Sequence, residues 1–144
     1  MSSPAEYIAT AKQIVKSVME SNTDKAGKIY YNHCRTVAEA FNDYRYICVG
    51  LLHDVLEDTP YTETDLRKHF PDEIVDAVVA LTRKENEPYL DSYIPRVTEN
   101  EIATKVKIAD LLHNLDLTRL SHISMRDAVR NRRYLKALKI LTLN

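Results

Sequence analysis

The segment 51-LLHDVLED-58 sets one histidine and three carboxylates among leucines and a valine. On a helix, Asp54 and Asp58 would face the same side, as would His53 and Glu57, because residues four positions apart lie about one turn apart. Burying that much polarity costs several kcal/mol unless each group is paired or bound to a cation. Salt bridges, exposure to solvent or a metal ion could each meet this cost, so other segments must decide among them.

A later segment, 107-KIADLLHN-114, again carries polar groups at helical spacing. Lys107, Asp110 and Asn114 would lie on one side of a helix. Taken alone, Lys107 and Asp110 are more typical of a surface ion pair than of a functional site. His113 is interpreted as a structural histidine that hydrogen-bonds within the core, and it is not counted as a metal ligand.

An earlier segment, 30-YYNHCR-35, adds His33 at the opening of an amphipathic stretch. In chain order, His33, the pair His53-Asp54 and Asp110 form the pattern H…HD…D. This pattern resembles the signature of the HD superfamily of metal-dependent phosphohydrolases. Four such residues alone are a weak signal, because they occur by chance in many chains.

The longer pattern resembles the hydrolase domain of the alarmone synthetase/hydrolase family, which removes the 3′-pyrophosphate of (p)ppGpp. The resemblance spans roughly residues 24 to 120. Besides the four signature residues, it rests on these groups: Glu57-Asp58-Thr59, Asp65-Leu66, Phe70, Lys107 and His113-Asn114.

The resemblance implies a role for each matching residue. Four residues would bind the metal: His33, His53, Asp54 and Asp110. Glu57 would be the general base that assists the attacking water, and Asp58 would act as a positioning group or as a proton donor. Lys107 and Asn114 would face the substrate. A mixed set of imidazole and carboxylate ligands suits a divalent ion of intermediate hardness such as Mn²⁺, although another divalent transition metal is possible.

Basic residues offer further candidates for the binding of phosphate. Five could do so, although most basic residues simply solvate a helix face: Lys25, Arg83, Lys84, Arg96 and Arg119. Lys25 is favoured because its Lys-x-Gly arrangement resembles the nucleotide-facing loop of the family. Arg133 is assigned, with its basic neighbours, to the exposed start of the last helix.

Three positions depart from the family pattern. Asp24 stands where an arginine normally flanks the guanine base, Leu111 replaces an arginine after the metal-binding aspartate, and Asp116 lies where a Met-Arg-Thr sequence is usual. The groups that would bind metal and activate water are kept, whereas those that would contact base and ribose differ. The leading function is hydrolysis of (p)ppGpp, and the alternatives are a nucleoside monophosphate phosphatase or a non-catalytic module that binds metal and nucleotide.

Composition bounds the partners. The chain has 144 residues, 44% of them hydrophobic and 28% charged, and a net charge of −1. Without an excess of one charge, broad affinity for nucleic acid or membranes is not expected. Cys34 and Cys48 show no metal-binding spacing and are interpreted as buried small hydrophobes. We expect a cytoplasmic, stand-alone hydrolase, and the apolar end of the last helix suggests a possible homo-oligomer.

The pattern predicts a single all-α, HD-type domain over residues 1–144, with about seven to eight helices. Only two glycines occur, and helix-start signals recur along the chain. The helices are expected to begin near these residues: Pro4, Asn32, Asp43, Thr62, Pro71, Pro88, Glu101 and Ser124. A polar loop is expected to run to Gly27. The helix from Asp43 is expected to continue through His53-Asp54 until Thr59-Pro60 ends it.

Overall fold

The computed structural model describes residues 2–20, 25–115 and 124–143. These residues are mostly helical, no strand occurs among them, and the expected all-α fold is confirmed. The helices follow in this order: α1 (Pro4–Glu20), α2 (Lys25–Glu39), α3 (Tyr44–Leu52), α4 (Val55–Asp58), α5 (Glu63–Arg67), α6 (Asp72–Ala80), the π-helix η1 (Tyr89–Tyr93), α7 (Ile94–Val97), α8 (Glu101–Asn114) and α9 (Met125–Thr142). Among the described helices, none has both the length and the hydropathy needed to cross a membrane.

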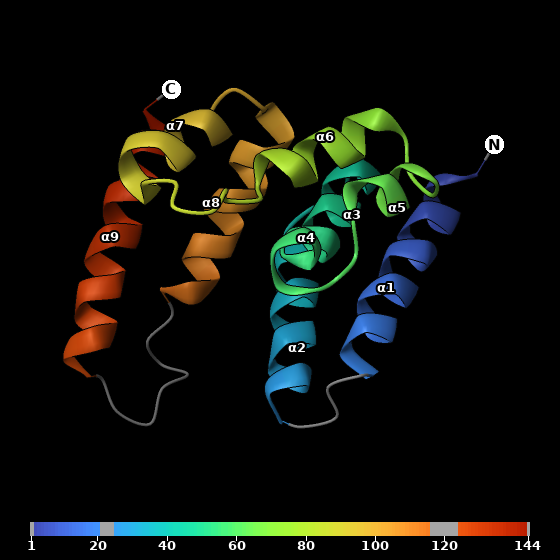
Figure 1. Cartoon of the computed structure of the whole chain (residues 1–144), viewed down its shortest axis with the longest axis horizontal. Helices are drawn as coiled ribbons and strands as arrows, with labels where there is room; N and C mark the ends of the chain where they lie inside the picture. Colours follow the sequence, from blue (N-terminus) through green and yellow to red (C-terminus); the bar gives the residue numbers. More distant parts are fainter. Residues whose placement is uncertain (1, 21–24, 116–123, 144) are drawn as a thin grey trace.

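Helix α3 lies at the centre of the fold, where it packs against α1, α2, α6 and α8 (Figure 1). Its residues 48–52 are all buried, as expected of a stretch that is apolar on every side. Helices α2 and α8 are distant in sequence, yet they contact each other as well as α3. The three segments that carry the candidate metal ligands therefore meet at one point.

Gly50 allows α2 and α3 to approach closely. A Cβ atom at this position would lie 2.9 Å from the Cα of Ala38 and 3.1 Å from its backbone nitrogen. Because those atoms belong to the backbone of α2, no rotation of a side chain could relieve the contact. The glycine thus sets the spacing between the helix that carries His33 and the helix that leads to His53.

Several helix starts agree with the sequence. Asp43 caps α3 by accepting a hydrogen bond from the backbone nitrogen of Arg45. Thr62 opens α5 with a reciprocal capping box, and Ser124 opens α9 in the same way. Cys34 and Cys48 are both buried, as expected of small hydrophobes.

Three expectations about the helices were wrong. Helix α2 begins at Lys25, so the segment up to Gly27 is not a loop and the helix starts seven residues before Asn32. The helix expected to run through His53-Asp54 ends at Leu52, and α4 begins at Val55. Pro88 does not open an α-helix, because the first turn after it is the π-helix η1.

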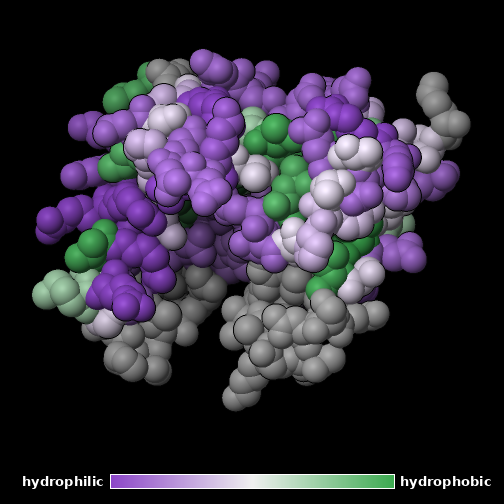
Figure 2. Space-filling view, in the orientation of Figure 1, coloured by the Kyte–Doolittle hydropathy of each residue, from purple (hydrophilic) through white to green (hydrophobic). Residues whose placement is uncertain are grey.

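The outer face of α9 is mostly hydrophilic, with scattered hydrophobic residues among the charged ones (Figure 2). Its inner residues Ala137 and Leu141 are buried, whereas Leu135 is 59% exposed. The apolar end of this helix therefore serves mainly the core. Self-association of the chain stays a prediction.

We expect the substitution Gly50→Ala to lower the free energy of unfolding by about 1–3 kcal/mol, because the added methyl group forces α2 and α3 apart. In an open helix the same change would raise stability by about 1 kcal/mol, so the sign of the effect is diagnostic. Urea unfolding followed by circular dichroism measures it. An increase in stability would contradict the close approach described here.

Candidate metal centre and substrate pocket

A break in the helix aims His53 and Asp54 at the same point. On a continuous helix these neighbours would diverge by about 100°. Here His53 is the C-cap that follows α3, and Asp54 has φ −105° and ψ 0°, in the sparsely populated bridge region. The Nε2 atom of His53 lies 3.1 Å from Oδ2 of Asp54. The irregular backbone thus lets two neighbouring side chains point to one centre, whereas on a regular helix they would diverge.

His53 presents one ring nitrogen to the interior of the site. Its Nδ1 donates a hydrogen bond to the carbonyl oxygen of Gly50, 2.6 Å away. Its Nε2 is buried and has no partner in hydrogen-bonding geometry among the described residues. A buried polar atom without a hydrogen bond is costly, and binding a metal ion would satisfy it. A metal-binding histidine usually donates from its other ring nitrogen in just this manner.

His33 from α2 and Asp110 from α8 complete the cluster. Nε2 of His33 donates to Oδ1 of Asp110 at 2.7 Å, and the same oxygen lies 3.5 Å from Nε2 of His53. Ligand atoms of His33, His53 and Asp54 all lie within 4.8 Å of one another. The structure thus brings together all four residues that the sequence nominated as metal ligands.

Asp110 is the most heavily contacted group of the cluster. Besides His33, it accepts hydrogen bonds from Nζ of Lys107 at 3.0 Å and from Nδ2 of Asn114 at 3.1 Å. Burial alone would raise the pKa of Asp110, but the charge of Lys107, the hydrogen bond from His33 and the nearby His53 lower it well below its ordinary value. Asp110 is therefore an ionised carboxylate in the interior.

The cluster favours a positive charge at its centre. Burial by itself would lower the pKa of His53, yet Asp54 and Asp110 raise it well above its ordinary value. Two imidazoles and two carboxylates are a suitable ligand set for a divalent transition metal. The donor set and the unsatisfied Nε2 of His53 both fit a divalent cation.

His113 also belongs to this region, beyond the structural role that the sequence suggested. Its Nδ1 lies 2.6 Å from Nδ1 of His33, and the two rings stack with centroids 4.9 Å apart. His33 is therefore held from both sides, by Asp110 at one nitrogen and by His113 at the other. Spacing on α8 could have suggested this contact, because His113 follows Asp110 by three residues.

The acidic pair Glu57-Asp58 lies on α4, just after the cluster. Oε1 of Glu57 accepts a hydrogen bond from the backbone nitrogen of Arg83 at 2.8 Å. Burial, followed by the charges of Asp54 and Glu57, raises the pKa of Asp58 to about 6. Glu57 borders the pocket described next, and Asp58 is not among its lining residues.

A pocket of about 310 Å³ opens directly over the cluster. It is bordered by residues of α2, α4, η1, α8 and α9 and of the segments that follow α3 and α6: His33, His53, Asp54, Glu57, Leu81, Arg83, Tyr89, Tyr93, Lys107, Asp110, Asn114, Arg133 and Tyr134. Polar surface predominates in its wall, which suits a charged ligand better than an apolar one.

Part of the pocket wall combines tyrosines with cations. Lys107 lies 5.7 Å from the ring centroid of Tyr89 and 5.3 Å from that of Tyr93. Burial would lower the pKa of Lys107, but Asp110 raises it, so the ammonium group stays charged. The guanidinium groups of Arg83 and Arg133 lie 5.4 and 4.5 Å from the centroid of Tyr89. Sequence reasoning placed Arg133 on an exposed helix face and missed its position beside the pocket.

The other basic candidates differ in their placement. Arg83 borders the pocket, and its role in binding phosphate stays a prediction. Arg96 instead pairs with Glu87 in the interior, which leaves it unsuited to a substrate. Lys84 is not among the lining residues. The side chain of Lys25, like all of Arg119, lies outside the part of the chain that the structure describes.

Known proteins are similar to this chain in sequence and in fold. The sequence is 31% identical to guanosine-3′,5′-bis(diphosphate) 3′-pyrophosphohydrolase of Haemophilus influenzae over 116 residues, which cover 71% of this chain and 17% of that protein. It is 26% identical to the bifunctional (p)ppGpp synthase/hydrolase SpoT of Escherichia coli over 129 residues, or 78% of this chain and 18% of that protein. The chain is homologous to one segment of the SpoT-type proteins.

The resemblance stated from the motifs is thus confirmed, although the chain spans less than a fifth of the length of these relatives. No protein-family model matches the sequence. Among solved structures, a metazoan ortholog of SpoT that hydrolyses ppGpp aligns with a TM-score of 0.79 at 20% identity, over 98% of this chain and 88% of that one. At this identity the likeness establishes the SpoT-type fold.

We expect Mn²⁺ to stabilise the chain, because an ion that binds only the folded state raises the free energy of unfolding. The gain is about 2.7 kcal/mol at a free concentration one hundred times the dissociation constant. Asp54→Ala should abolish this gain, and Glu57→Ala should retain it. Thermal unfolding with and without the metal measures both, and an equal loss in the two variants would overturn the assignment of ligands.

Proposed function

We propose that the chain is a metal-dependent phosphohydrolase that acts on a nucleotide, and that (p)ppGpp, cleaved at its 3′-pyrophosphate, is the leading substrate. The observation that carries the proposal is the convergence of His33, His53, Asp54 and Asp110 beside Glu57 in one polar pocket. Homology to SpoT-type proteins supports the choice of substrate. The altered positions Asp24, Leu111 and Asp116 are the reason to test other nucleotides.

The four-residue cluster would hold the cation, for which Mn²⁺ is our choice. A bound divalent ion would polarise a phosphoryl oxygen and acidify a water molecule. His33 would bind through Nε2, since its Nδ1 is engaged with His113. Asp110 would be oriented by the hydrogen bonds from Lys107 and Asn114.

Glu57 is the residue that we propose as acceptor of the proton from the attacking water. Its Oε1 is held by the backbone nitrogen of Arg83, whereas its Oε2 makes no hydrogen bond to any residue that the structure describes. One oxygen thus fixes the carboxylate and the other can face water in the pocket. Asp58, with its pKa raised to about 6, can hold or release a proton near neutral pH and would assist as a proton donor.

The cationic wall would bind the phosphate groups of the substrate. Arg83, Lys107 and Arg133 border one pocket with Tyr89, so several anionic groups can be neutralised at once. The guanidinium of Arg133 lies against the rings of Tyr89 and Tyr134, and the side chain is exposed, so its charge can meet an anionic ligand. Asn114 borders the same pocket from α8 and could also contact the nucleotide.

A nucleotide panel that includes ppGpp and nucleoside monophosphates tests the activity. We expect the Mn²⁺-loaded chain to release pyrophosphate from ppGpp, and Glu57→Ala to lower kcat about 10²- to 10⁴-fold while the metal stays bound. Release of orthophosphate from monophosphates instead would favour the phosphatase alternative. Tight nucleotide binding with no product from any substrate would favour the non-catalytic alternative.

The cationic wall is tested by the neighbouring pair Arg133 and Arg132, which share a helix, a charge and an exposed position. Arg133→Ala should raise KM about tenfold or more, since one charge-assisted contact to phosphate contributes roughly 1.5–3 kcal/mol. Arg132→Ala, outside the pocket lining, should leave KM unchanged. Equal effects of the two variants would mean that Arg133 acts by general electrostatic attraction of the substrate and not by a contact in the pocket.

A further inference from the structure

We propose that the buried Glu87–Arg96 pair positions Glu57, acting through the main chain of residues 81–87. The inference rests on the proposed function, in which Glu57 acts on the attacking water. Helix α4 is a single turn of four residues, and Glu57 projects from it toward solvent as an exposed side chain. The turn itself therefore supplies little restraint on that carboxylate, and a restraint from outside α4 would have a functional use.

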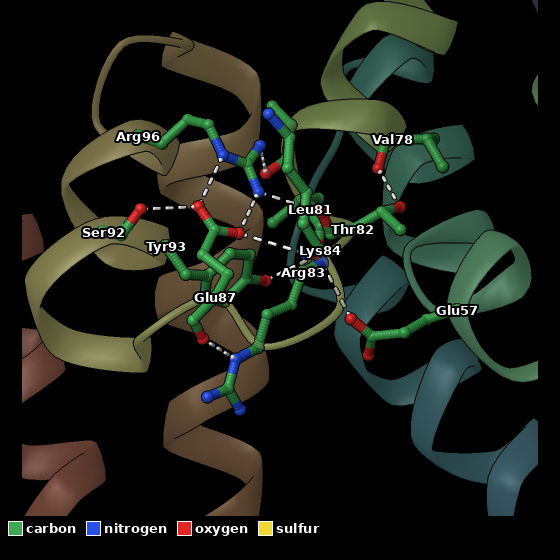
Figure 3. A network of polar contacts seen from close by, with 11 residues as sticks. Glu57, Val78, Leu81, Thr82, Arg83, Lys84, Glu87, Ser92, Tyr93 and Arg96 are labelled. Carbon is green, nitrogen blue, oxygen red and sulfur yellow. Dashed lines mark hydrogen bonds and ion pairs between the residues drawn. The ribbon is translucent and has the colours of Figure 1, made fainter.

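Glu87 is the anchor of the network drawn in Figure 3. The residue is 8% exposed, and its carboxylate accepts hydrogen bonds at both oxygens. Oε1 accepts from Arg96 at 2.8 Å and from the backbone nitrogen of Lys84 at 3.1 Å. Oε2 accepts from Arg96 at 3.1 Å and from Ser92 at 2.9 Å. Hydrogen bonds from Arg96 lower the pKa of Glu87 to about 2, which keeps it ionised at physiological pH.

Arg96 ties this carboxylate to the end of α6. Its guanidinium also donates to the carbonyl oxygens of Ala80 at 3.1 Å and Thr82 at 3.0 Å. The hydroxyl of Tyr93 donates to the neighbouring carbonyl of Leu81 at 2.5 Å. Carbonyl groups at the end of a helix lack partners within it, and here the side chains of η1 and α7 supply them. Both ends of the segment are thereby fixed.

Arg83 connects the anchored segment to Glu57. Its side-chain Nε donates to the carbonyl oxygen of Glu87 at 2.7 Å, which closes the segment on itself. Its backbone nitrogen donates to Oε1 of Glu57 at 2.8 Å (Figure 3). Glu87 is thus connected to Glu57 by the hydrogen bonds of Arg83 and Lys84 and by the backbone between them. Loss of the contacts of Glu87 should therefore displace the backbone nitrogen of Arg83, which is the hydrogen-bond donor to Glu57.

Asn86 offers a way to disturb the segment without changing its charges. It has φ +61°, in the left-handed region that asparagine and glycine tolerate and β-branched residues do not. Asn86→Val should strain the turn between Lys84 and Glu87, whereas Asn86→Gly should preserve it. Because the side chain is exposed, neither variant removes a core contact.

The test measures the amide of Arg83 and the turnover of the same proteins. In ¹⁵N–¹H spectra, Glu57→Gln should shift the Arg83 amide, since its acceptor loses its charge. Glu87→Gln and Asn86→Val should shift the same amide, and Asn86→Gly should not. With ppGpp as substrate, we expect Glu87→Gln and Asn86→Val to lower kcat roughly ten- to hundredfold, with KM and the Mn²⁺ affinity nearly unchanged.

A double variant separates positioning from general destabilisation. Added to Glu57→Gln, the change Asn86→Val should cause no further loss of kcat, because the carboxylate on which it acts is already gone. An additive loss, or an Arg83 amide that ignores Glu87→Gln and Asn86→Val, overturns the inference. If the unaltered chain hydrolyses no nucleotide, the proposed function fails, and the amide response alone still decides whether Glu87 positions Glu57.

Discussion

The buried carboxylate of Asp110 is the interaction on which the arrangement of this molecule depends. The residue is 4% exposed and its carboxylate is ionised, and an ionised carboxylate in an interior must be surrounded by donors or cations. Those partners come from two helices, with His33 on α2 and both Lys107 and Asn114 on α8. The charge can be buried only if these helices pack together, so satisfying Asp110 and assembling the site are the same event.

A second constraint is the short interruption at His53-Asp54. A regular helix would have buried this pair without giving both side chains one direction. The interruption lets His53 bond back to Gly50 while Asp54 turns toward the same centre. The missing side chain of Gly50 also lets α2 approach. Local irregularity and close packing thus serve one purpose, which is to gather polar groups from separate segments.

The part of the pocket wall around Tyr89 is assembled differently. There, the functional groups come from η1, α9 and the segment after α6, where spacing within any one helix says nothing about proximity. Tyr89 and Tyr93 flank the ammonium group of Lys107, and Arg133 arrives from the last helix. The buried pair Glu87–Arg96 supports this wall. These contacts join residues that are far apart in the sequence, so spacing along one helix does not predict them.

By itself, the sequence determined the all-α class, the caps at Asp43, Thr62 and Ser124, and the candidate set around His53-Asp54. These follow from local rules, because capping residues and helical spacing act within a few positions. Only the tertiary structure decided that the helix breaks at that pair, that His113 and Arg133 lie at the site, and that Arg96 forms an ion pair with Glu87. Such outcomes depend on which helices pack together, and packing energy overrides local preference wherever the two differ.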